Sequence, residues 1–260
     1  MGEVASYPVG TFSWVDLGTT DVEGAKAFYR GLFGWQMEDL PTSEGSYTMC
    51  RLEGRDVAGI HEHAEGEGTD WGSSISVDDV DAATARAREL GATVLAEPAD
   101  LPGVARVARV ADPGGAAVVL SQPRGHIGAG LVNEVGAWGW NELVTPDLAA
   151  ATAFYARLFG WGAQDIPGEF PRTSFSLGDL LVGGGHAPTP QEGPAARWTI
   201  SFRVADADQS AERVQQLGGA VLLPPLDIPV GRFAIVADPA GASFSIMAVP
   251  GGPLRGVDGS

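Results

Sequence analysis

The sequence predicts an α+β fold that occurs twice in the chain. The segment from Ser13 to Trp35 recurs as Gly139 to Trp161, with apolar, acidic and aromatic positions in the same order. The turns Asp112-Pro-Gly-Gly and Asp238-Pro-Ala-Gly follow later, also in the same order. A content of 37 glycines and 18 prolines favours many short strands and turns over long helices. We therefore predict tandem duplicated domains, each made of two strand–helix–strand–strand–strand (βαβββ) modules.

The first module begins with a strand over residues 13–18, where apolar and polar residues alternate. A helix follows, with Asp21 as its N-cap and Gly34 at its end. Its inner face is formed by apolar residues at helical spacing, namely Val22, Ala25, Phe28 and Phe33. Three further strands are predicted near residues 35–38, 47–52 and 57–63.

The second module follows the same plan. A strand over residues 73–77 leads to a helix over about residues 80–90, capped by Asp79 and ended by Gly91. Its other strands are predicted near residues 94–96, 105–110 and 117–121. The whole plan then repeats, which gives domain 1 (residues 9–123), a linker (124–137), domain 2 (138–250) and a flexible tail (251–260).

Composition narrows the classes of partner. With 33 acidic and 16 basic residues, the chain carries a formal net charge of −17, which repels nucleic acid and anionic membranes. No apolar run is long enough to span a bilayer, and the N-terminus has no secretory signal pattern. Cys50 is the single cysteine, which excludes an internal disulfide. These features predict a cytoplasmic protein that binds neither nucleic acid nor membranes.

Two motifs identify a family resemblance. AFYRGLFGW returns as AFYARLFGW, and VADPGGA returns as VADPAGA. Over residues 9–250 the chain resembles the vicinal oxygen chelate superfamily, which includes glyoxalases, bleomycin-resistance proteins and extradiol dioxygenases. The resemblance implies that each domain curls its two modules into an incomplete barrel around a cavity that receives a small molecule.

Three of the four metal-ligand positions usual in that superfamily hold no good ligand in either copy. In metal-using members, ligands project from the first and last strands of each module. The equivalent positions hold poor or non-ligating residues, namely Trp14, Gly72 and Val119 in domain 1 and Trp140, Thr199 and Ser245 in domain 2. We therefore expect no cofactor.

The alternative is a divalent transition metal at the fourth usual ligand position, on the predicted strand over residues 57–63. His61 and His63 are two residues apart on a predicted strand, so their imidazoles would share a face, and Asp16 would supply an oxygen. In the competing interpretation, the strand ends here and both histidines lie in a solvated acidic loop. In domain 2, His186 matches His61 but has no second histidine beside it.

The first strands place an indole and a carboxylate on one face, Trp14 with Asp16 and Trp140 with Glu142. Indoles favour a flat, partly apolar ligand. We therefore predict ligand contacts from the strand tryptophans and from two late-strand arginines, namely Trp14, Trp71, Trp140, Trp198, Arg106 and Arg232. The competing interpretation places the tryptophans in the core and pairs each carboxylate with an arginine as a scaffold feature, Asp16 with Arg106 and Glu142 with Arg232.

These residues leave two main functions open. The first is a metal-independent small-molecule-binding protein that holds an aromatic metabolite or antibiotic, in resistance or secondary metabolism. The second is an enzyme of secondary metabolism, a lyase, isomerase or oxygenase, with Asp16 or Glu142 as general base or a metal at His61 and His63. A third interpretation gives domain 2 only a structural role, with Phe202 and Phe244 filling its cavity. Either a monomer or a homodimer is compatible with the sequence.

Overall fold

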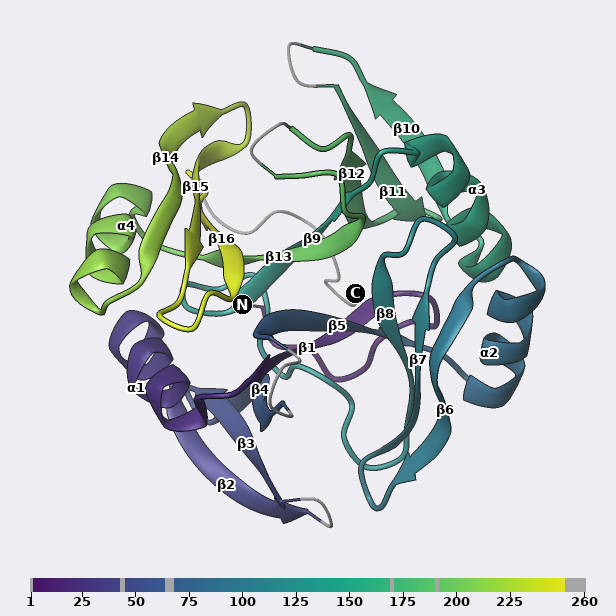
Figure 1. Cartoon of the computed structure of the whole chain (residues 1–260), viewed down its shortest axis with the longest axis horizontal. Coiled ribbons are helices and arrows are strands. Elements are labelled where there is room, and N and C mark those ends of the chain that lie inside the picture. Colours follow the sequence, from purple (N-terminus) through teal and green to yellow (C-terminus); the bar gives the residue numbers. More distant parts are fainter. Residues whose placement is uncertain (1, 43–44, 64–67, 169–170, 190–191, 251–260) are drawn as a thin grey trace.

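The computed structural model describes residues 2–42, 45–63, 68–168, 171–189 and 192–250. The predicted tail over residues 251–260 lies outside these ranges. No helix in the described part of the chain has the length and apolar character needed to cross a membrane. Each half of the chain forms one eight-stranded sheet with two helices (Figure 1).

In domain 1 the strands lie in the order β2-β3-β4-β1-β5-β8-β7-β6. The two modules join where β1 pairs antiparallel with β5, and within each module the first and last strands run parallel. The elements are β1 (Phe12–Thr19), α1 (Val22–Phe33), β2 (Gln36–Thr42), β3 (Gly45–Leu52), β4 (Arg55–Glu62), β5 (Asp70–Ser76), α2 (Val80–Glu89), β6 (Thr93–Leu101), β7 (Ala105–Ala111) and β8 (Ala117–Pro123).

Domain 2 repeats this topology in the order β10-β11-β12-β9-β13-β16-β15-β14. Its elements are β9 (Trp138–Val144), α3 (Leu148–Phe159), β10 (Gly162–Ile166), β11 (Arg172–Leu177), β12 (Leu180–His186), β13 (Arg197–Arg203), α4 (Ala207–Gln216), β14 (Ala220–Ile228), β15 (Gly231–Ala237) and β16 (Ser243–Ala248). The predicted α+β duplication is confirmed, although the outer strands β6 and β14 are longer than their short apolar runs suggested.

The helices begin and end where the sequence places their caps. Asp21 accepts a hydrogen bond from the backbone N–H of Gly24, and Gly34 ends α1 in the left-handed region at φ 73°. Asp147 and Gly160 do the same for α3. Because both ends of each long helix are fixed, the aromatic face of each helix is held against the sheets.

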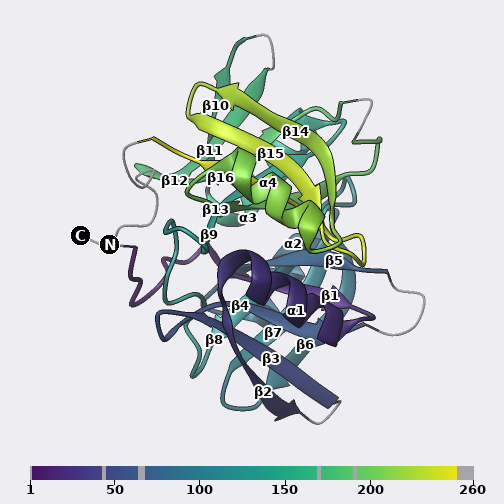
Figure 2. The same cartoon turned by 90° about the vertical axis from the view of Figure 1, so that its left-hand side faces the viewer.

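The two sheets lie back to back, with their curled inner sides facing away from each other (Figure 1). Helix α1 of domain 1 lies against α4 of domain 2, as Figure 2 shows from the side, and α2 lies near α3. The ring centroids of Trp71 and Phe202 are 5.1 Å apart across the domain boundary. One continuous apolar core therefore extends through both halves.

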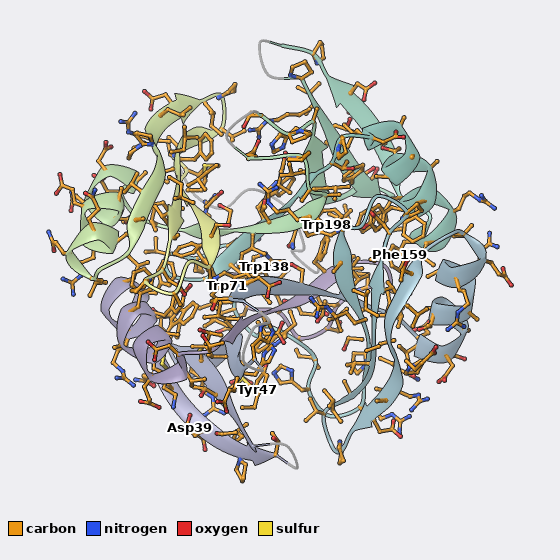
Figure 3. All side chains as sticks on the ribbon, viewed as in Figure 1. Asp39, Tyr47, Trp71, Trp138, Phe159 and Trp198 are labelled. Carbon is orange, nitrogen blue, oxygen red and sulfur yellow. The ribbon has the colours of Figure 1, made fainter. Side chains whose placement is uncertain are left out.

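Two of the predicted cavity tryptophans belong to this core. Trp71 pairs with Leu17 on β1, so its ring points to the side of the sheet opposite Asp16. Figure 3 shows Trp71 and Trp198 between the two sheets. The prediction that Trp71 and Trp198 line the cavities is wrong. Each precedes the inward-facing residue of its strand by one position, so its ring points to the opposite side of the sheet. Phe202 and Phe244 are also buried between the domains, so the interpretation that they fill the domain 2 cavity is wrong too.

A buried hydrogen-bond relay joins the halves twice. Trp71 Nε1 donates to the Tyr29 hydroxyl at 3.0 Å, and that hydroxyl donates to Asp238 Oδ2 at 3.1 Å. The second relay runs from Trp198 through Tyr155 to Asp112, at 2.8 and 3.1 Å. In both cases a helix of one domain reaches the Asp-Pro turn of the other. The FY and ADP motifs that reveal the duplication therefore fasten the two copies together.

Candidate functional site

The candidate site lies on the inner side of the domain 1 sheet and is centred on Asp16. Alternation along β1 places Trp14, Asp16 and Gly18 on this side. Asp16 is paired with Gly59 on β4 and with Gly72 on β5. Both neighbours lack a side chain, so neither adjacent strand covers the carboxylate.

The carboxylate of Asp16 is close to an imidazole without being bonded to it. Its Oδ2 atom lies 3.9 Å from Nδ1 of His61, beyond hydrogen-bond distance. The Nδ1 atom is itself buried and has no hydrogen-bond partner among the described residues. Burial raises the pKa of Asp16, the positive charges of His61 and Arg109 oppose this, and Asp70 adds to it. The pair is thus placed to interact with a third group.

Aromatic rings close one side of the site. Trp14 Nε1 donates to the Tyr47 hydroxyl at 2.8 Å, and the Tyr47 ring occupies the space above Gly59. Figure 3 shows Tyr47 on the inner side of the curled sheet. His126, from the linker, contacts the Trp14 ring edge-on with centroids 4.7 Å apart. The linker therefore supplies part of the wall, and Trp14, although predicted as a ligand contact, is 8% exposed and held by these neighbours.

The second histidine faces the same side but is used differently. The His63 ring lies over Gly18, with its centroid 5.1 Å from that of His61. Its Nδ1 atom lies 3.1 Å from the Gly68 carbonyl oxygen and 3.7 Å from Asp70 Oδ1. His63 thus closes the end of the site near β5.

The donor set does not match a metal centre. Within the described ranges, no three His, Cys, Asp or Glu side chains converge on a point where an ion could be held. Three of the superfamily's four ligand positions are occupied by an indole, a glycine and a valine in domain 1, and only the fourth, on the strand of His61, holds a possible ligand. The residues present therefore do not fit the metal that the fold family implies.

The equivalent place in domain 2 is filled by the chain's own contacts. Glu142 Oε2 accepts a hydrogen bond from Trp140 Nε1 at 2.6 Å. Its Oε1 atom lies 3.2 Å from His186 Nδ1 and 3.9 Å from Arg172. The register that pairs Thr173 with Gly185 brings Arg172 next to His186, much as Tyr47 pairs with His61 in domain 1. The carboxylate of Glu142 is therefore satisfied within the protein, unlike that of Asp16.

A second carboxylate reaches the far side of His186. Glu192 Oε1 lies 3.2 Å from Nε2 of His186, and Glu192 Oε2 accepts hydrogen bonds from the Thr189 backbone N–H and hydroxyl. Burial tends to lower the pKa of His186, but the bonds and charges of Glu142 and Glu192 outweigh it and raise the pKa. His186 therefore lies between two carboxylates that favour its protonated form.

The predicted arginine pairs are wrong. Arg106 donates two hydrogen bonds to Asp81 of α2, at 2.8 and 2.9 Å, on the outer side of the sheet. Arg232 does the same with Asp208 of α4. Arg109, three residues after Arg106 and therefore on the opposite face of β7, is the arginine whose charge acts on Asp16.

Sequence reasoning also missed several inner-side residues, namely Tyr47, Asp70, Arg109, His126 and Glu192. Tyr47 had a readable signal, since alternation along its strand puts it on one face with Met49 and Arg51. The other four depend on sheet register or on loop paths, for which the sequence holds no local pattern.

A duplicated βαβββ scaffold with a polar centre inside each curled sheet defines the structural class of this chain. The family models agree with this class. Residues 11–120 match the Glyoxalase/Bleomycin resistance protein/Dioxygenase superfamily, and residues 141–247 match the Glyoxalase-like domain. The chain belongs to this superfamily, as the vicinal oxygen chelate motifs implied.

Whole-length relatives support the assignment. A Mycobacterium tuberculosis protein named as a glyoxylase, CFP32, is 41% identical over 256 residues, which is 95% of this chain and 98% of the relative. The anthracycline biosynthesis protein DnrV of Streptomyces peucetius is 33% identical over 259 residues, covering 93% and 94%.

Solved structures share the fold at low sequence identity. The 2,2',3-trihydroxybiphenyl 1,2-dioxygenase of Sphingomonas wittichii matches with a TM-score of 0.66 and 17% identity, covering 96% of this chain and 93% of that one. The Mn(II)-bound glyoxalase of Novosphingobium aromaticivorans matches with a TM-score of 0.64 and 17% identity, covering 92% and 82%. These likenesses establish the fold alone.

Proposed function

We propose that domain 1 binds a small aromatic metabolite on the inner side of its sheet, without a metal ion, and that domain 2 serves as the scaffold half. The observation that carries this proposal is the state of the two central carboxylates. Asp16 is half-buried and receives no hydrogen bond from the described residues, whereas Glu142 is bonded to Trp140 and His186. A carboxylate that is mostly removed from water and has no hydrogen-bond partner in the described chain favours a ligand that supplies one.

Aromatic ligands suit the walls of this site. Trp14 and Tyr47 form the aromatic wall beside Asp16, with the half-buried Tyr47 as the more accessible ring, and a flat molecule that stacks on an aromatic ring gains about 0.5–1.5 kcal/mol per contact. The names of the relatives agree with a place in secondary metabolism, since DnrV is an anthracycline biosynthesis protein and anthracyclines are polycyclic aromatic compounds. Sequestration of such a compound, as in resistance, or its handling during biosynthesis would both use this site.

Proton transfer is a second candidate function, and one observation favours it. The raised pKa of Asp16 brings the carboxyl closer to neutral pH, which suits a general base, and His61 stands 3.9 Å away. Asp16 would take a proton from the bound molecule, and His61 would stabilise the negative charge that develops. A lyase or isomerase reaction needs no more than these two groups for its proton steps.

Calorimetric titration with a panel of planar aromatic compounds tests binding. We expect one site per chain, abolished by Trp14→Ala, weakened by Asp16→Ala and retained in the matched variants Glu142→Ala and Trp140→Ala. Metal analysis of the purified protein, with His61→Ala and His63→Ala as controls, tests the absence of an ion. Binding that disappears with the domain 2 variants instead, or a stoichiometric metal lost in the histidine variants, would overturn the proposal.

A further inference from the structure

A carboxylate oxygen of Asp16 and a ring nitrogen of His61 face the same space, where both could bond one ligand atom. Asp16 Oδ2 and His61 Nδ1 are 3.9 Å apart, too far to bond each other. An oxygen placed about 2.7 Å from the carboxylate and 2.9 Å from the imidazole nitrogen would meet both at roughly a right angle, which a small ring rotation widens. Gly59 and Gly72 on the adjacent strands add no side chain here, and the Tyr47 hydroxyl of β3 lies above Gly59, where it forms the wall of this space.

We propose, on the basis of the function proposed above, that the ligand of domain 1 carries a hydroxyl group on its aromatic ring and that this hydroxyl bridges Asp16 and His61. The O–H donates to Asp16 Oδ2, and the hydroxyl oxygen accepts from Nδ1 of His61. The site is thus selective for phenols over aromatic compounds without a hydroxyl.

The surrounding charges favour a neutral hydroxyl over an ionic group. Asp16 and Asp70 face the site and repel a carboxylate or phosphate on the ligand, while Arg109 and the two histidines disfavour an ammonium group. A hydroxyl both donates and accepts, so it satisfies the carboxylate and the buried nitrogen together. Leaving either one unpaired costs binding free energy, and this cost is the source of the selectivity.

Domain 2 shows what happens when the protein fills the same place itself. There the distance between Glu142 Oε1 and His186 Nδ1 is 3.2 Å, and the two side chains bond directly. Aspartate in place of glutamate shortens the side chain by one methylene and leaves the gap of 3.9 Å in domain 1. The bridging position exists only in domain 1.

Matched sets of probes test the selectivity by calorimetry. Each set contains a hydroxylated, a methoxylated and an unsubstituted ring, such as 2-naphthol, 2-methoxynaphthalene and naphthalene, with hydroxyanthraquinones as a larger set. We expect the hydroxylated member to bind at least about tenfold more tightly than both others. Asp16→Ala and His61→Phe should each remove this preference, and Glu142→Ala should keep it.

The outcomes separate the two proposals. Equal affinity for all three members of each set would overturn the hydroxyl bridge and leave the binding function standing. No binding by any set would overturn both. A second measurement follows the ultraviolet absorbance of bound 2-naphthol against pH: contact with Asp16 should raise its ionisation pH above that of free naphthol, and Asp16→Ala should cancel the increase. An unchanged ionisation pH in the unaltered protein would also overturn the bridge.

Discussion

Domains 1 and 2 share a topology but treat their central carboxylates in opposite ways. In domain 1, Trp14 bonds Tyr47 and leaves Asp16 without a hydrogen bond from the described residues. In domain 2, Trp140 bonds Glu142, which also contacts His186. Domain 2 has Arg172 in the place that Tyr47 holds in domain 1. Trp140 therefore has no tyrosine hydroxyl to bond there and donates to Glu142 instead.

The difference shows how a duplicated fold can divide its work. The contacts that join the halves recur in both copies, since each Trp–Tyr–Asp relay has its counterpart. The contacts inside the curled sheets do not recur. The contacts between the two halves are therefore symmetrical, whereas the two central carboxylates differ. Glu142 is bonded within the protein, and Asp16 has no hydrogen bond from the described residues.

The largest expected effect tests the symmetrical part. Asp112 accepts hydrogen bonds from the backbone N–H groups of Gly114 and Ala116 and from the Tyr155 hydroxyl. Asp112→Ala would leave three donors unpaired and should lower the free energy of unfolding by about 3–5 kcal/mol. Asp238→Ala should cost a similar amount, because Asp238 has the same partners in the other half. Urea denaturation measures both, and a clearly unequal loss would show that the relays are not equivalent.

The next effect has opposite signs in the two domains. Glu142→Gln weakens charged hydrogen bonds and should lower the free energy of unfolding by about 1–3 kcal/mol. Asp16→Asn should raise it at neutral pH, because desolvation raises the pKa of Asp16 and so disfavours its charged form in the folded protein. A raised native pKa makes the protein lose stability as pH rises from the ordinary aspartate range through the raised value. The gain from Asp16→Asn should therefore disappear in acid.

Thermal unfolding of these two amide variants between pH 4 and pH 8 makes the comparison. If both variants destabilise the protein at neutral pH, Asp16 has a hydrogen-bond partner within the protein. The proposed difference between Asp16 and Glu142 would then be wrong.

The third prediction concerns the pH dependence of domain 2. The pKa of His186 is raised, so its contribution to stability is complete below the ordinary histidine value of about 6.5 and is lost as pH rises through the raised value. The pKa of Glu192 is lowered by its Thr189 and His186 contacts, although burial opposes this, so its contribution is lost as pH falls through the lowered value. His186→Gln should cost about 1–2 kcal/mol near pH 6 and little at high pH.

The matched variant in domain 1 is His61→Gln, which should change stability little at either pH because Nδ1 of His61 has no hydrogen bond to lose in the described chain. Urea denaturation at pH 6 and at high pH gives both numbers. A similar loss for both histidines would mean that His61 is also bonded within the protein.

Much of the fold could be predicted from the sequence because its signals are local. The caps Asp21 and Asp147 and the terminal glycines of the helices lie within a few residues of the elements they bound, and the structure confirms them. The duplication adds independent support, since each pattern occurs twice. The superfamily follows from the same repeated motifs and is confirmed by the family models.

The site could be predicted only in part. Alternation along one strand places Trp14 with Asp16, and the next parallel strand brings His61. The prediction of Arg106 as an inward-facing residue is wrong because the sequence does not show which face of β7 points inward. That face depends on the register with β8, where Arg109 pairs with Val119 and Arg106 with Gln122. Glu192 reaches His186 through a loop, and no periodic pattern predicts such a contact.

The smallest expected effect tests the outward placement of Arg106 and Arg232. Arg106 and Arg232 bond helix residues on the outer sides of the two sheets, where ion pairs in contact with water contribute little. Arg106→Ala and Arg232→Ala should therefore leave the unfolding temperature close to that of the unaltered protein and should leave the affinity for aromatic probes unchanged. If Arg106→Ala alone weakened probe binding, this arginine would act on the inner side of domain 1, as the sequence first suggested. The outer pairing seen here would then not be the one that operates in solution.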